Sequence, residues 1–252
     1  MQKRTNRAIW LLAAILAAAL VAGAGPLAIY LRPYWIAKYR GERASLPGAA
    51  LPDAPLQGAN LFGAYLREAN LSAADLRGAR LADTCLARAR MIGATVETAD
   101  LHGADLQAAD LTGASGGRAM LWGARMRGAI LRRADLRGAD LRFAILLRAD
   151  LRGAKLAQAK LGGTKLRAAD LRNADLRGAR FSGWNMQGGT VSAGDLQGAD
   201  LRNADLRGAE LQGADLRGAA MRGAQLAGAH CDRRTRWPAG FDPRRHGARR
   251  VE

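Results

Sequence analysis

Apolar residues recur at every fifth position along most of this chain. Counting in fives from Leu46 to Leu226 gives 37 positions, and 36 of them hold Leu, Met, Val or Phe; the exception is Gly116. Alanine stands two residues before the apolar residue in 32 of these units. The phase never shifts. Because loops tolerate insertions readily, we expect every residue of this stretch to be structurally registered.

A period of five fits neither regular element. In an α-helix, five residues advance about 500°, so successive leucines would wander around the cylinder. In a strand, side chains alternate with a period of two, so a step of five moves each leucine to the opposite face. The pattern therefore predicts a chain that turns a corner once per unit. Its coils would stack about 4.8 Å apart, hydrogen-bonded as in a parallel sheet.

The remaining positions of the unit agree with such a coil. The residue two after each leucine is often glycine, as at Gly138 and Gly178, and glycine suits a tight corner. The residues on either side of the leucine, such as Asp135 and Arg137, are expected to point outward and keep the surface soluble.

Residues 169–180 read A-A-D-L-R-N-A-D-L-R-G-A, and this A-(D/N)-L-x-x unit resembles the signature of the pentapeptide repeat family. The resemblance covers about residues 44–230. It implies an all-β solenoid, a right-handed quadrilateral β-helix with four units per coil and about nine coils. The number four comes from the resemblance alone, because the sequence shows no clear signal at twenty residues.

The amino-terminal part, residues 1–43, contains an uncharged apolar segment at 8–31. As a helix this segment spans roughly 36 Å, enough to cross a hydrocarbon core of about 30 Å. Basic residues flank both of its ends, and Tyr34 and Trp35 lie where an interfacial aromatic belt would be. We expect an uncleaved single-pass membrane anchor. The competing interpretation is a signal peptide cleaved near 22–24, followed by export. The flanking positive charges nearly balance, so the side of the membrane that holds the repeats is not predicted.

Both ends of a stacked coil need a cover, because they expose unpaired backbone groups. The proline-containing stretch 44–58 is expected to cover the first coil. In the last segment, 231–252, the leucine period stops, and we expect Trp237 and Phe241 to pack over the final coil ahead of a basic, solvated tail. The sequence thus divides into 1–43, a repeat region at 44–230 and a C-terminal cap at 231–252.

The formal net charge is +17, of which the repeat region carries +7. Such an excess favours anionic partners, and it opposes the role of DNA mimic that some pentapeptide repeat proteins use to shield DNA gyrase through an acidic surface. The two cysteines, Cys85 and Cys231, form no disulfide framework or zinc motif.

Two surface features depart from the regular unit. The first is a set of apolar residues at outward or corner positions, predicted to form a partner surface, with scattered exposure or contact with a second copy as alternatives: Met120, Trp122, Ile130, Phe143, Ile145 and Leu147. The second is a basic belt, predicted to hold an anionic polymer or lipid unless it is simply a solvated surface: Arg148, Arg152, Lys155, Lys160, Lys165 and Arg167. Arg172, Arg177 and Arg180 extend this belt.

A further irregularity lies at Trp184, which replaces an inward alanine among several glycines. A tryptophan does not fit a tight corner, so we expect a local bulge there. The three histidines are dispersed, the aspartates repeat in one environment, and the sequence shows no phosphate loop or nucleophile elbow. The sequence therefore predicts no active site, metal or cofactor. It favours a membrane-anchored interaction scaffold with an unidentified protein partner, with polyanion binding as the alternative and gyrase modulation third.

Overall fold

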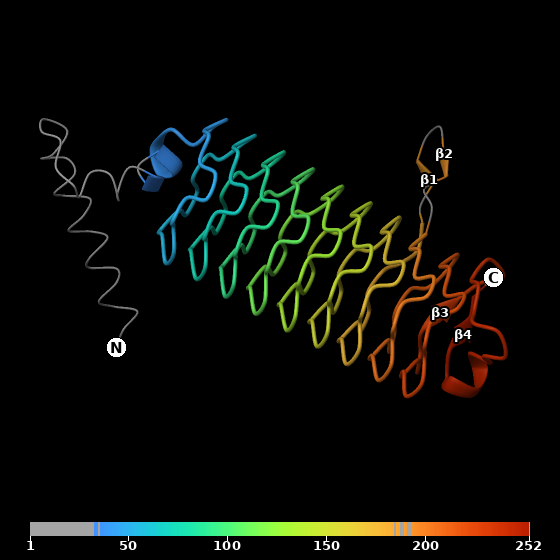
Figure 1. The fold of residues 1–252 in the computed structure, drawn as a ribbon. Coiled ribbons are helices and arrows are strands. Elements are labelled where there is room, and N and C mark those ends of the chain that lie inside the picture. The colour runs from blue at the N-terminus through green and yellow to red at the C-terminus, as the bar shows by residue number, and fades with distance from the viewer. Residues whose placement is uncertain (1–32, 35, 184, 187–188, 191–192, 252) are drawn as a thin grey trace, which may run out of the picture.

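The computed structural model describes residues 33–34, 36–183, 185–186, 189–190 and 193–251. They form a rod of stacked coils, with the first repeats at one end and the C-terminus at the other (Figure 1). A solenoid is therefore the fold, as the period of five predicts.

The coils have four sides. Parallel bridges link residues 20 apart along the chain, so four five-residue units complete one turn. Each side is named here by its bridging residues in the middle of the rod: side A by 125, 145 and 165; side B by 130, 150 and 170; side C by 135, 155 and 175; side D by 120, 140, 160, 180 and 210. Sides A and C lie on opposite faces of the rod, as do sides B and D.

Every backbone amide of a regular unit has an acceptor. In the unit from Leu136 to 140, the first, third and fifth amides donate to neighbouring coils at 2.8–2.9 Å, and the amide of Ala139 closes the turn onto Leu136 O at 3.1 Å. The remaining amide, that of Arg137, donates to the carboxylate of Asp135 at 3.3 Å. The aspartate before leucine therefore has a structural role, since it caps a turn amide that the coils cannot reach.

The interior is built from two positions of each unit, the large apolar residue at the leucine position and the small residue two before it, which stack from coil to coil. The described apolar residues at the leucine position are at most 6% exposed, and the alanines two residues earlier are buried beside them. Gly116 leaves no large void, because side-chain atoms of Leu136 and Val96 come within 3.0 and 3.1 Å of where its Cβ would be.

The corner two residues after each leucine has a positive φ whether or not it holds glycine. Sixteen non-glycine residues adopt this conformation, among them Ala168 with φ 57°. For an L-residue the left-handed region costs about 1–2 kcal/mol, against about 0.5–1 kcal/mol for the extra flexibility that glycine adds to the unfolded chain.

Replacing Ala168 with glycine should therefore raise the free energy of unfolding by about 0.5–1 kcal/mol. The matched control is Ala169→Gly, because Ala169 is buried, has no positive φ and should lose stability on the same change. Thermal unfolding of the full chain compares the two variants. A higher midpoint for Ala169→Gly than for Ala168→Gly would contradict this explanation of the corner.

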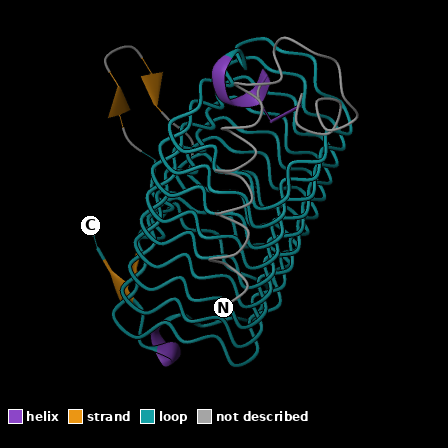
Figure 2. Cartoon of the chain, turned by 90° about the vertical axis from the view of Figure 1, so that its left-hand side faces the viewer, coloured by secondary structure: helices purple, strands orange, loops and turns teal. Residues whose placement is uncertain are grey.

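One coil is longer than the others. Lys160 bridges Arg180, which lies 20 residues on, but Arg180 bridges Glu210, 30 residues on. Among the ten extra residues, the described ones include an antiparallel hairpin of β1 (Asn185–Met186) and β2 (Gly189–Thr190), which projects from the stack (Figures 1 and 2). Trp184 lies outside the described residues. The departure from the rod occurs where a bulge was predicted, but the expectation that every residue of the repeat is registered in a coil is wrong.

The hairpin is closed at its base by the rod itself. The amide of Gly194 donates to Phe181 O at 2.9 Å, so the chain resumes the coil where it left it. A Cβ at Gly194 would come within 2.8 Å of the Phe181 ring, which explains the glycine at an inward position that otherwise holds alanine.

The cover of the first coil differs from the prediction. Residues 44–58 are themselves part of that coil, since Ser45, Ala50 and Pro55 bridge to the second coil. The cover is the preceding segment, where residues 36–39 are helical and Tyr34 and Ala37 are buried in the core. The prolines suit an end coil because Pro55 stands where a backbone N–H would otherwise face the missing coil before it.

The last coil is covered as predicted. Trp237 and Phe241 pack against the core, and their rings stack with centroids 5.4 Å apart. The chain then forms the 3-10 helix η1 (Arg244–His246) and returns as β4 (Arg249–Arg250), which pairs in parallel with β3 (His230–Cys231). The exposed arginines of β4 form a charged edge strand, which discourages end-to-end association.

Within the part of the chain that is described, no helix has the length and hydropathy needed to cross a bilayer. The predicted anchor at 8–31 lies outside those residues.

Candidate functional site: the groove on side D

Asp–Arg pairs recur over the rod surface in the same local arrangement. In Asp150-Leu151-Arg152, the guanidinium donates from Nε to Oδ1 at 2.9 Å and from Nη2 to Oδ2 at 2.8 Å, while the Arg152 amide donates to Oδ1 at 3.2 Å. The same arrangement recurs at Asp75, Asp135, Asp140, Asp170, Asp175, Asp200, Asp205 and Asp215, each with the arginine two residues later.

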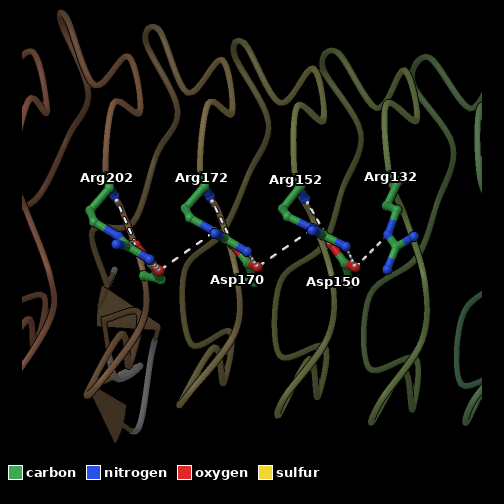
Figure 3. A network of polar contacts seen from close by, with 7 residues as sticks. Arg132, Asp150, Arg152, Asp170, Arg172 and Arg202 are labelled. Carbon is green, nitrogen blue, oxygen red and sulfur yellow. Dashed lines mark hydrogen bonds and ion pairs between the residues drawn. The ribbon is translucent and has the colours of Figure 1, made fainter.

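On side B these pairs join into a ladder along the rod. Arg132 Nε donates to Asp150 Oδ2 at 2.5 Å, and Arg152 Nε lies 3.5 Å from Asp170 Oδ2 (Figure 3). The ladder continues in the same way through Arg172 (Figure 3). Partial burial alone would raise the pKa of Asp150, but the hydrogen bonds from Arg152 and Arg132 outweigh it and hold the pKa at about 2. The Asp150 carboxylate therefore stays ionised and bound to its two arginines, so it stabilises the rod and is not available as an acid or base.

Side D differs because its regular unit is interrupted over several coils. Met120 occupies the bridging position and Trp122 the outward position after leucine, where they are 42% and 47% exposed. The Trp122 ring stacks on the ring of His102 in the preceding coil, with centroids 5.1 Å apart and planes 4° from parallel. His102 is in turn held by Asp100, whose Oδ1 lies 2.6 Å from His102 Nδ1.

A groove of about 340 Å³ lies further along side D, towards the base of the hairpin. Its lining combines three cations, one acid and two small residues: Arg142, Lys160, Arg180, Glu210, Gly162 and Ser182. Gly162 stands in the column of outward positions between Arg142 and Ser182, so the groove exists because this unit lacks a side chain there.

The charged groups of the groove are held by neighbours, with one exception. A hydrogen bond to Asp140 raises the pKa of Arg142, and Arg180 Nε donates to Glu210 Oε1 at 3.0 Å. Ser182 Oγ donates to the other carboxylate oxygen of Glu210 at 3.2 Å. Lys160 forms no ion pair with any described residue, so its ammonium group is available to a ligand.

The backbone adds an unused donor to the groove. In regular units the amide after the leucine is capped by the aspartate before it, as Arg142 is by Asp140 at 3.3 Å. In this unit Lys160 replaces the aspartate, and the amide of Gly162 has no acceptor among the described residues. Because Gly162 is buried, a bound acceptor would satisfy an amide that the protein leaves unpaired.

The predicted apolar patch is largely one surface. Met120 and Trp122 lie on side D, and in the next coil Phe143 lies at the corner between sides D and A, with Ile145 and Leu147 following on side A. Ile130 lies on side B, which faces the opposite way, so it does not belong to this surface.

The basic belt encircles the rod. Lys155, Lys160 and Lys165 bridge on sides C, D and A in turn. Arg152 is paired with Asp150 and Asp170, and the corner residue Arg148 is exposed; Lys155 approaches Asp135 at 4.0 Å, and Arg167 approaches Asp195 at 3.8 Å. Of the predicted belt residues, only Lys160 and Arg180 line the groove.

Comparison with known proteins accounts for the repeated unit. The family model described as pentapeptide repeats matches in 8 copies, over residues 54–91, 86–115, 117–146, 144–183 and 194–230. This chain belongs to the pentapeptide repeat family. The matches stop at 183 and resume at 194, which are the limits of the hairpin excursion.

Solved pentapeptide repeat structures resemble the chain to different degrees. HetL, from the cyanobacterium Nostoc sp. strain PCC 7120 and involved in heterocyst differentiation regulation, is 34% identical over 79% of this chain and 92% of its own, with a TM-score of 0.35. A trypsin-treated form of QnrB1, a plasmid-mediated fluoroquinolone resistance protein, is 20% identical over 75% of this chain and 92% of its own, with a TM-score of 0.54. At that identity the second likeness shows the fold alone. Among curated proteins, no match to the chain was found.

The sequence pointed to part of the groove of this pentapeptide repeat protein. Lys160 and Arg180 were both among the basic residues that the sequence grouped in the belt, but Glu210 and Arg142 were not assigned to a site with them. The available signal was the unit Lys160-Leu161-Gly162, where the capping aspartate and the outward side chain are lost together.

Proposed function

We propose that this protein is a non-enzymatic scaffold that presents side D of its rod to a protein partner. The observation that carries the proposal is the cluster of exposed Met120, Trp122 and Phe143 on consecutive coils, in a chain that has only 5% aromatic residues. Exposed aromatic anchors are typical of partner-binding surfaces, where they supply much of the binding energy.

The neighbouring surfaces favour side D over the others. The Asp and Arg side chains of side B bind each other. A partner that covered side B would therefore gain few new polar contacts from them. The Trp122–His102 stack, by contrast, presents a broad and rigid aromatic platform.

We further propose that residues 8–31 anchor the protein in a membrane as a single span, which would hold the rod close to the bilayer surface. The support is the length of the uncharged run and its basic and aromatic flanks. For the rod we propose right-handed winding, the usual hand for crossovers between parallel strands, over about nine coils.

The scaffold proposal predicts that a Trp122→Ser/Phe143→Ser variant loses its partner. Full-length protein and the double variant would be used for affinity capture from membranes, with Ile130→Ser as the control because it removes an outward apolar side chain from the opposite side. We expect recovery of the partner to fall at least tenfold for the double variant and to stay unchanged for the control. Equal recovery with all three proteins would remove side D from the account. A second copy of this chain as the captured protein would identify the surface as a homo-oligomer contact.

Polyanion binding is the second candidate, and the C-terminal cap favours it. Its seven arginines are all exposed, and Arg233, Arg244, Arg249 and Arg250 form no ion pair with any described residue. Binding to DNA or to anionic vesicles would weaken steeply with salt. Binding that is absent or insensitive to salt would exclude this candidate.

A further inference from the structure

We propose that the groove on side D binds a phosphate group, presented either by a soluble phosphate monoester or by a lipid headgroup. The groove lies on the same side of the rod as the protein-binding surface proposed above, but it is lined by other residues than Met120, Trp122 and Phe143, and neither proposal depends on the other.

The donors of the groove suit a phosphate. Arg142 and Arg180 supply guanidinium groups, Lys160 supplies an ammonium group, and the Gly162 amide supplies a backbone donor. A phosphate monoester offers three acceptor oxygens and carries close to two negative charges at neutral pH. A carboxylate has only two oxygens and one charge, so it would leave more of these donors unsatisfied.

The site is organised before any ligand arrives. Asp140 holds the guanidinium of Arg142, and Glu210 holds that of Arg180 at 3.0 Å. With these two carboxylates counted, the groove keeps a net charge of +1, supplied by the unpaired Lys160. Fixed donors lose little conformational entropy on binding, which favours affinity.

The Gly162 amide indicates where in the groove a phosphate oxygen would bind. In regular units an aspartate oxygen occupies the place in front of the equivalent amide, as Asp140 Oδ1 does at 3.3 Å from the Arg142 nitrogen. A phosphate oxygen in the groove would take the place of that missing carboxylate oxygen. The volume of about 340 Å³ leaves room for the rest of a small ester and falls within the usual range of ligand sites, roughly 300–1,000 Å³.

The test measures binding to the full chain in neutral detergent micelles by calorimetry. The probes are inorganic phosphate and glycerol 3-phosphate, with succinate as the carboxylate comparison. We expect both phosphates to bind. Glycerol 3-phosphate should bind more weakly at pH 5 than at pH 7.5, because the second ionisation of a phosphate monoester lies near pH 6. Adding phosphatidate to the micelles separates the sources: displacement of glycerol 3-phosphate indicates the lipid headgroup, and no displacement indicates a soluble ester. Equal binding of succinate would overturn the assignment to phosphate.

Two variants distinguish a built site from general attraction to a basic rod. Gly162→Arg restores the residue that regular units carry at this position, adds a positive charge and fills the groove; we expect at least a tenfold loss of affinity. Lys160→Gln should lose about tenfold, whereas Lys155→Gln, the equivalent change on side C, should lose less than twofold. Unchanged or tighter binding by Gly162→Arg, or equal losses for the two lysine variants, would refute the site.

Discussion

Replacing Leu146 with alanine should lower the free energy of unfolding by about 2–5 kcal/mol, the usual cost of removing a buried leucine side chain from a packed core. Leu146 is 1% exposed and lies in the stacked interior of the middle coils. In a solenoid each coil contacts only its neighbours, so the cavity cannot be filled by distant rearrangement.

The matched control is the next residue in the chain. Leu147 has the same side chain but points outward from side A, where it is partly buried. We expect Leu147→Ala to cost less than about 1 kcal/mol. Denaturant unfolding of both variants measures the difference. Equal costs would show that the leucine at every fifth position does not define the interior.

Replacing Asp150 with alanine should cost about 1.5–3 kcal/mol, although its side chain lies at the surface. The substitution removes the acceptor for the Arg152 amide and the ionic contacts to Arg152 and Arg132, and hydrogen bonds to charged groups are worth roughly that amount. Asp150→Asn is the matched variant. It keeps an oxygen for the amide and loses only the charge, so it should cost less than the alanine variant. Thermal unfolding at pH 7 makes the comparison, and equal costs for the two variants would contradict the capping role.

The same carboxylate makes stability depend on pH in a defined direction. The pKa of Asp150 is about 2 in the folded chain, below its ordinary value of 3.8. Its contribution is therefore present above about pH 4 and is lost as the pH falls from about 4 towards 2. Arginine hydrogen bonds outweigh burial and lower the pKa of other ladder and pair aspartates as well: Asp135, Asp175, Asp200, Asp205 and Asp215. The unfolding midpoint should fall through this window, and less steeply for Asp150→Asn than for the parent. A parallel fall in both proteins would contradict the assigned cause.

The interior could be predicted from the sequence because one feature, an apolar residue at every fifth position, defines it along the whole rod. A leucine at every fifth position fits a coil with a corner per unit and excludes a helix or a flat strand. The period alone does not give the number of sides, since coils of three, four or five sides would each bury the leucines, and the expectation of four came from the family resemblance. The 20-residue spacing of the bridges decides it.

The hairpin shows the limit of reasoning from period. One coil is longer by ten residues, and ten is a multiple of five, so the phase of the leucines passes through unchanged. The signals of the departure were Trp184, in place of an inward alanine, and the glycines around it. The column of Lys160, Arg180 and Glu210 depends on this excursion, because Glu210 follows Arg180 by 30 residues.

The aspartates were misread for a related reason. Their alternation with leucine and arginine suggests a solvated charged surface, but their side chains are only partly exposed, for example 19% for Asp150. Their capping of a turn amide depends on backbone geometry, which the sequence does not display. Once this role is known, a unit without the aspartate becomes informative, and Lys160-Leu161-Gly162 is such a unit.

We propose that this rod binds its partner on side D, where the regular Asp–Arg unit is interrupted. One coil offers four equivalent outward positions for testing it, namely Trp122 on side D, Arg127 on side A, Arg132 on side B and Arg137 on side C, and all four are exposed. A photo-crosslinking residue placed at each position in turn, in full-length protein within its own membranes, should give a discrete partner adduct at position 122 and none at 132 or 137. Adducts of equal yield at all four positions, or adducts confined to 132 or 137, would contradict the account.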